Sequence, residues 1–341
     1  MQSVTRQAVG VASCGMVSWT VHYDMRAPEF GTPAPALYAA ALEQAAWLDE
    51  RGVTALVVSE HHGEHDGYLP SPLTMAAALG ARTSRAMISV NALALTLHDP
   101  VDAAEQCQIV DQVSGGRLVL TVVPGYVESE FALYRVPYAG RGRLFDEKLD
   151  VFLAALTGEP FELDGRTLRV TPGPVQRPRP LVFVGGASRV AARRAARVGD
   201  GFALGGPDEG WGDAYRAACA ELGRPAGPVM VPPRPMAVHV ADDPERDWAR
   251  IAPHALHELN RYSAWAAGFD GHLYRDVSDP DDARRDGFYA VLTPDECVDV
   301  ARRLQAEHST VLFKPLIGGL DPEVSWGSFE LFVDKVLPEL T

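Results

Sequence analysis

The sequence predicts an α/β fold of the (β/α)8 TIM-barrel class. Short apolar segments rich in β-branched residues alternate with longer helical segments along most of the 341 residues. Eight strand candidates occur, and nearly all are followed by a helix, which indicates a parallel sheet closed into a barrel. A doubly wound open sheet is the alternative, but no GxGxxG motif opens the first βα turn.

The predicted strands are short apolar runs bounded by turn residues. The run "TALVVSE" is continuous rather than alternating, which is typical of a strand with both faces buried. In chain order the strands are 8–19, 54–60, 86–95, 117–123, 180–186, 200–206, 235–241 and 309–316.

The predicted helices carry capping signals at their ends. Ser71-Pro72 is a good N-cap and first-turn pair, Thr293 is a second N-cap, and Gly52 ends the first helix. Pro253 predicts a break inside the longest helix. The helices are 34–52, 71–84, 99–116, 141–158, 188–199, 211–223, 243–266, 293–308 and 326–340.

Two stretches, 159–180 and 264–292, interrupt this alternation, and we treat them as insertions in a single barrel domain over 1–341. The first contains a predicted hairpin at 161–170. The second is rich in Gly, Asp and aromatic residues, and a loop of that length is either an active-site lid, with Phe269 to Tyr289 as its candidates, or a tolerated insertion. Trp19, Tyr126 and Trp211 are candidate pocket walls, although core packing explains aromatic residues equally well.

The composition predicts a cytoplasmic protein without nucleic-acid or membrane partners. The net charge of −14 disfavours binding to nucleic acid or an anionic membrane. No apolar run reaches the roughly 18 residues of a membrane span, and the first residues do not form a secretory signal. The four cysteines are scattered without a CxxC pair, which predicts reduced thiols rather than disulfides or a zinc knuckle.

A cluster of ionisable side chains follows the second strand, in "VVSEHHGEHDG". In a barrel of this class, reactive groups gather at the carboxyl ends of the strands, so Glu60, His61 and His62 fall on the catalytic face. His61 and His65 have the i, i+4 spacing that grips zinc on a helix, but Gly63 and the preceding strand argue against a helix here. We therefore predict no metal site. Two interpretations of this segment remain: a solvated loop, or an acid–base centre for an organic cofactor.

The turn "GGASR" joins the fifth strand to a helix that begins at Ser188. N–H groups and the helix dipole make such a corner a binding site for anions, and Ser188 and Arg189 add a hydroxyl and a cation. Many αβ turns carry glycines for steric reasons alone. Together with the histidines after the second strand, the corner suggests a phosphate-bearing cofactor across the barrel mouth.

The ordered series of motifs resembles the bacterial luciferase-like flavin-dependent monooxygenases. "LEQAAWLDERGVTALVVSEHHG" is similar to the first helix and second strand of that family, with its Glu-His-His ending. "HDPV", "DQVSGGR" and "GYVESEF" are similar to its middle section, and "VFVGGASRVAARRAARVGDGF" to its phosphate-binding strand and helix. "TPDECVDVARRL" and "FVDKVLP" resemble its C-terminal part.

The resemblance implies a (β/α)8 barrel that binds reduced FMN, or alternatively the deazaflavin F420, and that forms a homodimer. It places His61 at the catalytic histidine beside the flavin, with His62 and Glu60 as neighbours. It places Asn91-Ala92 against the flavin ring, often at a cis peptide bond, and it includes the Gly125-Tyr126 step after strand four. The implied phosphate turn is Gly185, Gly186, Ala187, Ser188 and Arg189.

One position departs from the pattern. Luciferase carries an arginine just before the step after strand four, where it helps to hold the phosphate, and here that residue is Pro124. Proline offers neither a cation nor an N–H group. Either Arg189 or another basic group replaces the arginine, or the preferred flavin differs, or flavin binding is weak.

The implied activity is oxidation of a small organic substrate by O2 through a flavin C4a-peroxide. A histidine, whose ordinary pKa is about 6.5, can exchange a proton near neutrality, which suits His61 to this task. His62 or Glu60 would orient His61, or Glu60 would only cap a loop. His98-Asp99 is interpreted as shaping a loop before Pro100. A separate flavin reductase is an expected partner if the flavin diffuses.

Three other readings stay open from the sequence. They are hydride transfer with F420, a non-catalytic flavin-binding protein and a metal-dependent barrel hydrolase. The sequence does not name the substrate.

Overall fold

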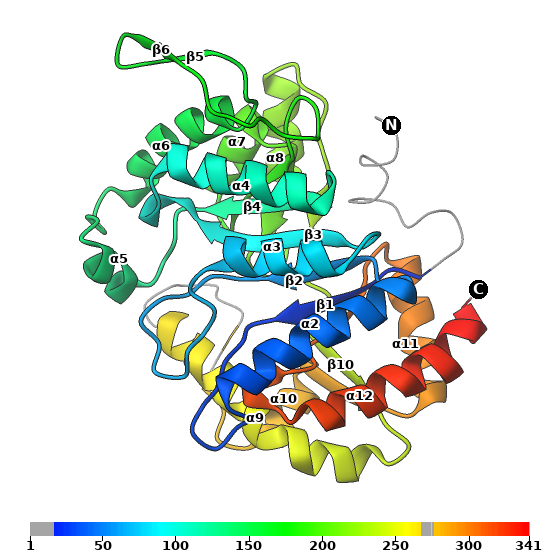
Figure 1. Cartoon of the computed structure of the whole chain (residues 1–341). Coiled ribbons are helices and arrows are strands. Elements are labelled where there is room, and N and C mark those ends of the chain that lie inside the picture. Colours follow the sequence, from blue (N-terminus) through cyan, green and yellow to red (C-terminus); the bar gives the residue numbers. More distant parts are fainter. Residues whose placement is uncertain (1–16, 267–273, 275, 341) are drawn as a thin grey trace. The chain divides into compact units, whose positions relative to one another are not determined.

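The computed structural model describes residues 17–266, 274 and 276–340, and the chain divides into two compact units. The first unit comprises Met1–Val57, Glu64–Leu69 and Pro232–Thr341, and the second comprises Val58–Gly63 and Pro70–Val231. Figure 1 traces the elements of both. The single domain expected over 1–341 stays a prediction.

The second unit is a parallel sheet covered by helices, as the βα alternation predicts. Its strands are hydrogen-bonded in the order β3, β4, β7, β8, β9, and each pairs in parallel with the next. Helix α4 packs beside α3 and α6, and α7 packs against α8 (Figure 1). The strands are β3 (Met87–Ala94), β4 (Leu118–Val123), β7 (Leu181–Gly186), β8 (Gly201–Leu204) and β9 (Val229–Met230). The helices are α3 (Pro72–Arg82), α4 (Pro100–Ser114), α5 (Glu128–Tyr134), α6 (Arg141–Ala155), α7 (Arg189–Val198) and α8 (Trp211–Glu221), with a 3-10 turn, η1 (Leu95–Leu97).

Local signals in the sequence fix several of these ends. The carboxylate of Asp99 accepts hydrogen bonds from two N–H groups of α4, and Gly115 ends that helix in the left-handed region. The guanidinium of Arg117 then donates to four backbone carbonyls, those of Gly80, Thr83, Ala86 and Ser114. One side chain thus donates hydrogen bonds to carbonyl groups at the C-terminal ends of both α3 and α4.

The first unit contains two groups of parallel strands. Strand β1 (Trp19–Tyr23) pairs with β12 (Val311–Phe313), and β2 (Ala55–Val58) is its other neighbour. Strand β10 (Ala237–Val240) pairs with β11 (Tyr289–Leu292). The helices are α2 (Ala34–Glu50), α9 (Pro244–Ala266), α10 (Pro280–Arg285), α11 (Pro294–Ala306) and α12 (Pro322–Leu331), with short turns η2 (Ile317–Gly319), η3 (Phe332–Val336) and η4 (Leu337–Leu340).

Two predicted boundaries are corrected near the first strand. Most of the expected strand 8–19 lies outside the described residues, and the strand that pairs with β12 begins, rather than ends, at Trp19. Trp19 is buried and its ring packs edge-on to Phe313, with centroids 6.2 Å apart. It is therefore a core residue, because it stands at the opposite end of the strand from the one predicted.

The proline in α9 does not break that helix. The helix runs from Pro244 to Ala266 with Pro253 inside it. Buried residues on both sides of the proline, including Trp248, Ile251 and Leu259, anchor the helix and outweigh the one hydrogen bond that proline removes.

The described residues of both insertions contain regular elements. Strands β5 (Phe161–Leu163) and β6 (Arg166–Leu168) form the antiparallel hairpin predicted within 159–180. In the stretch 264–292, α10 and β11 were not expected from the sequence, and β11 aligns Tyr289 with Ala237 of β10. The lid candidate Phe269 lies outside the described residues, whereas Tyr289 is a buried core residue.

A buried polar cluster lies in the core of the first unit. The ammonium of Lys314 donates to Oε1 of Glu258 over 2.8 Å, and the hydroxyl of Tyr289 donates to Oε2. The side chains of Glu258 and Lys314 are only 0% and 6% exposed. Both carboxylate oxygens of Glu258 are therefore matched, as a buried charge requires.

Among the described residues, Cys107, Cys219 and Cys297 are free and buried. No helix in the same part of the chain has both the length and the apolar character that crossing a bilayer demands.

Candidate active site

The predicted site residues of the second unit gather at the carboxyl ends of its strands. The hydroxyl of Ser59 donates to the carbonyl oxygen of Asn91 over 2.6 Å, which joins the segment after β2 to the end of β3. The register of β4 and β7 aligns Val122 with Val184, so the residues that follow these two strands are neighbours. The histidine segment, the Asn91-Ala92 step, the Gly125-Tyr126 step and the Gly185-Gly186 corner therefore share one edge.

A carboxylate from α5 holds His61. Oε1 of Glu130 lies 2.9 Å from Nδ1 of His61 and accepts the backbone N–H of His62 over 2.8 Å. The side chain of Glu130 is 3% exposed and that of His61 is 10% exposed. The ring of Tyr126 stands edge-on to the imidazole, with centroids 5.7 Å apart. Tyr126 thus links His61 to the step that follows β4.

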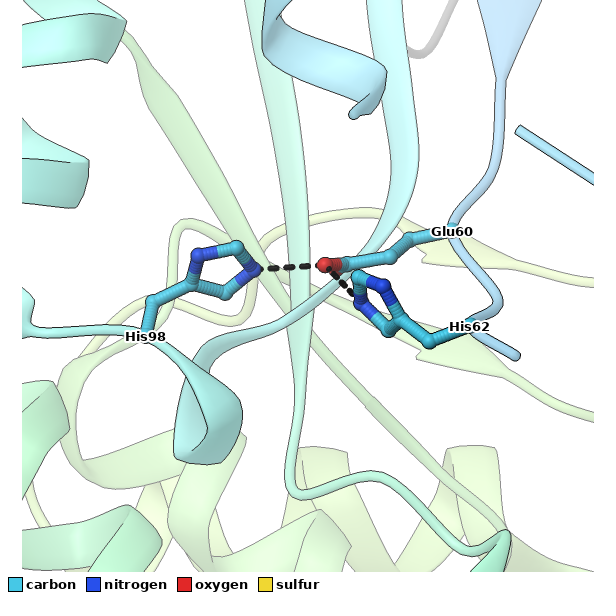
Figure 2. A group of neighbouring side chains, drawn as sticks. All are labelled: Glu60, His62 and His98. Atoms are coloured by element: carbon cyan, nitrogen blue, oxygen red, sulfur yellow. Dashed lines mark hydrogen bonds and ion pairs between the residues drawn. The ribbon is translucent and has the colours of Figure 1, made fainter. Parts of the chain in front are cut away.

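Glu60 and His62 belong to a second network, which includes His98 (Figure 2). The Nε2 atoms of His62 and His98 lie 2.7 and 2.5 Å from the same oxygen, Oε1 of Glu60. The other oxygen, Oε2, accepts the N–H of Ala94 over 2.6 Å. On its far side, the Nδ1 atom of His62 lies 2.9 Å from the hydroxyl of Tyr134.

The network keeps Glu60 ionised. Burial by itself would raise the pKa of this carboxyl group, but the hydrogen bonds from His62 and His98 outweigh it and lower the pKa to about 2. With Nε2 of His62 as the donor to Glu60, its Nδ1 atom accepts the proton of the Tyr134 hydroxyl. Glu60 is therefore a buried carboxylate that connects the segment after β2 with the end of β3.

The same three side chains, Glu60, His62 and His98, form the group of potential metal ligands found among the described residues, with ligand atoms within 4.8 Å of one another. The N···O separations of 2.5 and 2.7 Å are those of direct hydrogen bonds. An ion bound to both nitrogens and the oxygen at about 2.0–2.2 Å would push these atoms further apart. Hydrogen bonding accounts for the cluster, and the expectation of no metal site stays a prediction.

The peptide bond between Asn91 and Ala92 is cis, as the resemblance implied. Strand β3 carries an irregularity of register over residues 91–93, and its last residue, Ala94, is held by Glu60. This strand end therefore accepts a hydrogen bond from Ser59 and donates one to Glu60.

The corner after β7 has the features of an anion site, but its first glycine has a steric role. A Cβ at Gly185 would lie 2.6 Å from Cγ1 of Val123, so glycine is needed here for the close approach of β4. Gly186 has a φ of +153°, and a Cβ there would lie 2.6 Å from the Cβ of Ala191. Ser188 is the N-cap of α7, where its hydroxyl accepts the N–H of Ala191 over 3.1 Å.

After Ser188, the first turn of α7 is open to an anion. The early N–H groups of a helix have no carbonyl partner within it, and here they follow Ala187 and Ser188. Arg189, the first residue of α7, is exposed. Arg194 and Arg197 are less available to an anion than Arg189, because they form ion pairs with Asp146 and Asp150 of α6.

A guanidinium lies beside the step that follows Pro124. Nε of Arg141 donates to the carbonyl oxygen of Gly125 over 3.3 Å, and its Cζ lies 4.0 Å from the ring centroid of Tyr138. The next residue, Gly142, accepts a hydrogen bond from Arg194 of α7. The start of α6 thus brings Arg141 to Gly125 and also contacts α7.

Four residues of this edge were not predicted as site residues: His98, Glu130, Tyr134 and Arg141. The stretch 124–131 was interpreted as the end of a strand and a loop, whereas α5 begins at Glu128. Glu130 and Tyr134 have the i, i+4 spacing that places two side chains on one face of a helix, and this was the available signal. His98 was interpreted as shaping a loop, but it also donates to Glu60.

Known proteins resemble this chain in sequence. The sequence profile of the family described as luciferase-like monooxygenase matches residues 19–310. The 4-hydroxyprotoasukamycin monooxygenase of Streptomyces nodosus subsp. asukaensis is 28% identical over 319 residues, which cover 87% of this chain and 85% of that protein. The FMNH(2)-dependent dimethylsulfone monooxygenase of Pseudomonas putida is 34% identical over 112 residues, 30% of this chain and 31% of that one. The chain spans about half the length of other curated relatives, for example 46% of protein y4vJ from Sinorhizobium fredii, at 31% identity and with 46% of this chain covered.

Solved structures share the fold. The monooxygenase RslO1 from Streptomyces bottropensis has a TM-score of 0.76 at 22% identity, with 95% of this chain and all of that chain covered. The oxygenating constituent of 3,6-diketocamphane monooxygenase from Pseudomonas putida, in complex with FMN, has a TM-score of 0.68 at 19% identity, with 95% and 98% covered. An F420-dependent secondary alcohol dehydrogenase has a TM-score of 0.64 at 16% identity, with 96% and 100% covered. These likenesses confirm the predicted α/β barrel class.

The profile match extends over most of the chain and includes the histidine segment, the cis peptide and the corner after β7. The chain therefore belongs to the luciferase-like monooxygenase family.

Proposed function

We propose that this protein is a flavin-dependent monooxygenase that uses reduced FMN and O2 to oxidise a small organic substrate. The observation that carries the proposal is the placement of His61, held by Glu130, on the same strand-end edge as the anion corner at α7. The ring of Tyr126 contacts His61, and Tyr126 belongs to the Gly125-Tyr126 step that follows β4. A ring with a phosphate tail would extend from one to the other.

The bound flavin would supply the chemistry with O2. The residues of the chain would position it, exclude water and move protons. His61 is suited to exchange a proton with the reacting centre, because Glu130 fixes the orientation of its imidazole ring through Nδ1. We propose that Glu60 and His62 act as positioning residues, because their side chains are 0% and 3% exposed and face each other.

The residues at the anion corner fit a phosphate. The first turn of α7 and the hydroxyl of Ser188 form the corner, and α6, which carries Arg141, contacts α7 through Gly142 and Arg194. Arg141 would then take the place of the cation that is missing at Pro124. Asn91 and Ala92 would lie against the ring, at the end of β3.

Arg141→Ala is expected to weaken the binding of FMN by about 10- to 100-fold, because a charge-assisted hydrogen bond of about 1.5–3 kcal/mol is lost. Riboflavin, which lacks the phosphate, should bind the variant and the wild type equally. Fluorescence titration with both flavins measures this. Arg143→Ala is the matched control, because Arg143 lies in the same helix with its side chain 87% exposed. Equal losses for riboflavin and FMN would remove Arg141 from the phosphate site.

The experiment that tests the proposal is a titration of the purified protein with reduced FMN and with F420, followed by oxygen consumption. Protection against thermal unfolding by FMN, with substrate-dependent uptake of O2, is the expected result. F420-dependent hydride transfer is the second candidate, because an F420-dependent dehydrogenase shares the fold and Arg189 and Arg193 are exposed on α7. Stabilisation by F420 alone, without O2 uptake, would favour that candidate.

We further propose that the protein is a homodimer and that a reductase delivers the flavin. Helix α4 exposes two apolar side chains one turn apart, Ile109 at 49% and Val113 at 45%. A second copy of the chain would cover them. Light scattering after gel filtration should give twice the mass of one chain, and Ile109→Asp should shift it toward a single chain.

A further inference from the structure

We infer that Glu130 is the positioning residue of the reaction: it sets the tautomer and the orientation of the His61 ring. The link to catalysis rests on the proposed function, whereas the effect on His61 does not. Glu130 lies 69 residues along the chain from His61, on a short helix that the sequence pattern did not predict.

The tautomer follows from the shared acceptor. Oε1 of Glu130 accepts the backbone N–H of His62 over 2.8 Å, and that group is always a donor. The backbone thereby fixes the carboxylate in place, and Nδ1 of His61 lies 2.9 Å from the same oxygen. A ring nitrogen facing an ionised carboxylate carries a proton. His61 therefore holds its proton on Nδ1, and in the neutral ring Nε2 presents the lone pair.

Glu130 is fixed where it meets this ring. Its side chain is 3% exposed and that of His61 is 10% exposed, so water competes little for the contact. The neighbouring carboxylate of Glu60 is occupied by His62 and His98.

Glutamine and leucine test the acceptor at this position. In Glu130→Gln the amide oxygen can still accept both N–H groups. In Glu130→Leu the acceptor opposite Nδ1 of His61 is lost.

The test is NMR of histidine-labelled protein without flavin at high pH, with the His61 signals assigned from the spectrum of His61→Gln. The wild type and Glu130→Gln should show the Nδ1–H tautomer. Glu130→Leu should shift the ring toward the Nε2–H tautomer. Glu128→Leu, an exposed position on the same helix, should leave the tautomer unchanged.

Where turnover is measurable, Glu130→Gln should retain more of kcat than Glu130→Leu. An Nε2–H tautomer in the wild type, or the same tautomer in Glu130→Leu as in the wild type, would overturn the inference. Because the spectra need no flavin, failure of the protein to use any flavin would reject the proposed function and leave this result standing.

Discussion

Replacing His61 with alanine is expected to lower turnover by about 100- to 10,000-fold while the fold and flavin binding persist. The imidazole of His61 pairs with Glu130, whereas that of His62 pairs with Glu60. His61 is therefore outside the hydrogen-bond network of Glu60. Alanine removes the proposed proton carrier and leaves the proposed phosphate corner untouched. Steady-state oxygen consumption and flavin titration would be measured side by side.

His65→Ala is the control for this change, because His65 belongs to the same histidine-rich segment and is exposed. It should retain nearly full turnover. Undiminished turnover of His61→Ala would remove His61 from the mechanism. A loss of flavin binding in step with activity would instead assign the ring to binding.

The largest effect on stability is expected from Glu258→Leu, which should lower the free energy of unfolding by about 3–5 kcal/mol. The substitution leaves the ammonium of Lys314 without its anion in the core, because these side chains are 0% and 6% exposed. It also leaves the hydroxyl of Tyr289 without its acceptor. Urea unfolding at neutral pH, with the slope unchanged, measures the loss.

Two controls separate charge from packing. The double variant Glu258→Leu, Lys314→Met should recover much of the loss, because it removes both members of the ion pair together. Glu245→Leu, on the same helix as Glu258, breaks an exposed ion pair with Arg284 of α10 and should change the free energy of unfolding little. An equally small loss from Glu258→Leu would show that the buried pair contributes little.

The pH dependence of this contribution has a definite sign. Burial would raise the pKa of Glu258, but Lys314 and Tyr289 reverse this and place it below the ordinary value of 4.5. A carboxyl group with a depressed pKa in the folded state stabilises the protein above its unfolded pKa. The pair therefore contributes fully at neutral pH, and its contribution fades as the solution becomes acidic.

Rules that act over a few residues predicted much of the fold. Asp99 caps α4, Ser188 caps α7 and Thr293 forms a capping box with Glu296, all as their residue types indicate. The βα alternation predicted the barrel class, and the carboxyl-end rule placed His61 after the end of the second strand, where the structure also has it. The first described strand, β1, was displaced in the prediction because two apolar runs adjoin each other there.

The partners of the histidines could not be predicted from spacing. Glu130 meets His61 across 69 positions of the chain, and His98 meets Glu60 across 38. Such pairs depend on which strand ends become neighbours, which spacing along the chain does not encode, and on the short helix α5, whose signal is the single i, i+4 pair Glu130 and Tyr134. Arg141 illustrates the same limit, because the start of another helix brings it to Gly125 across 16 positions of the chain.

The two adjacent histidines have different partners. His62 meets Glu60, whereas His61 meets Glu130, which lies on α5. A single-residue insertion or deletion just before Glu60 would move both imidazoles out of these pairings. Neither histidine can therefore substitute for the other, although their letters in the sequence are identical.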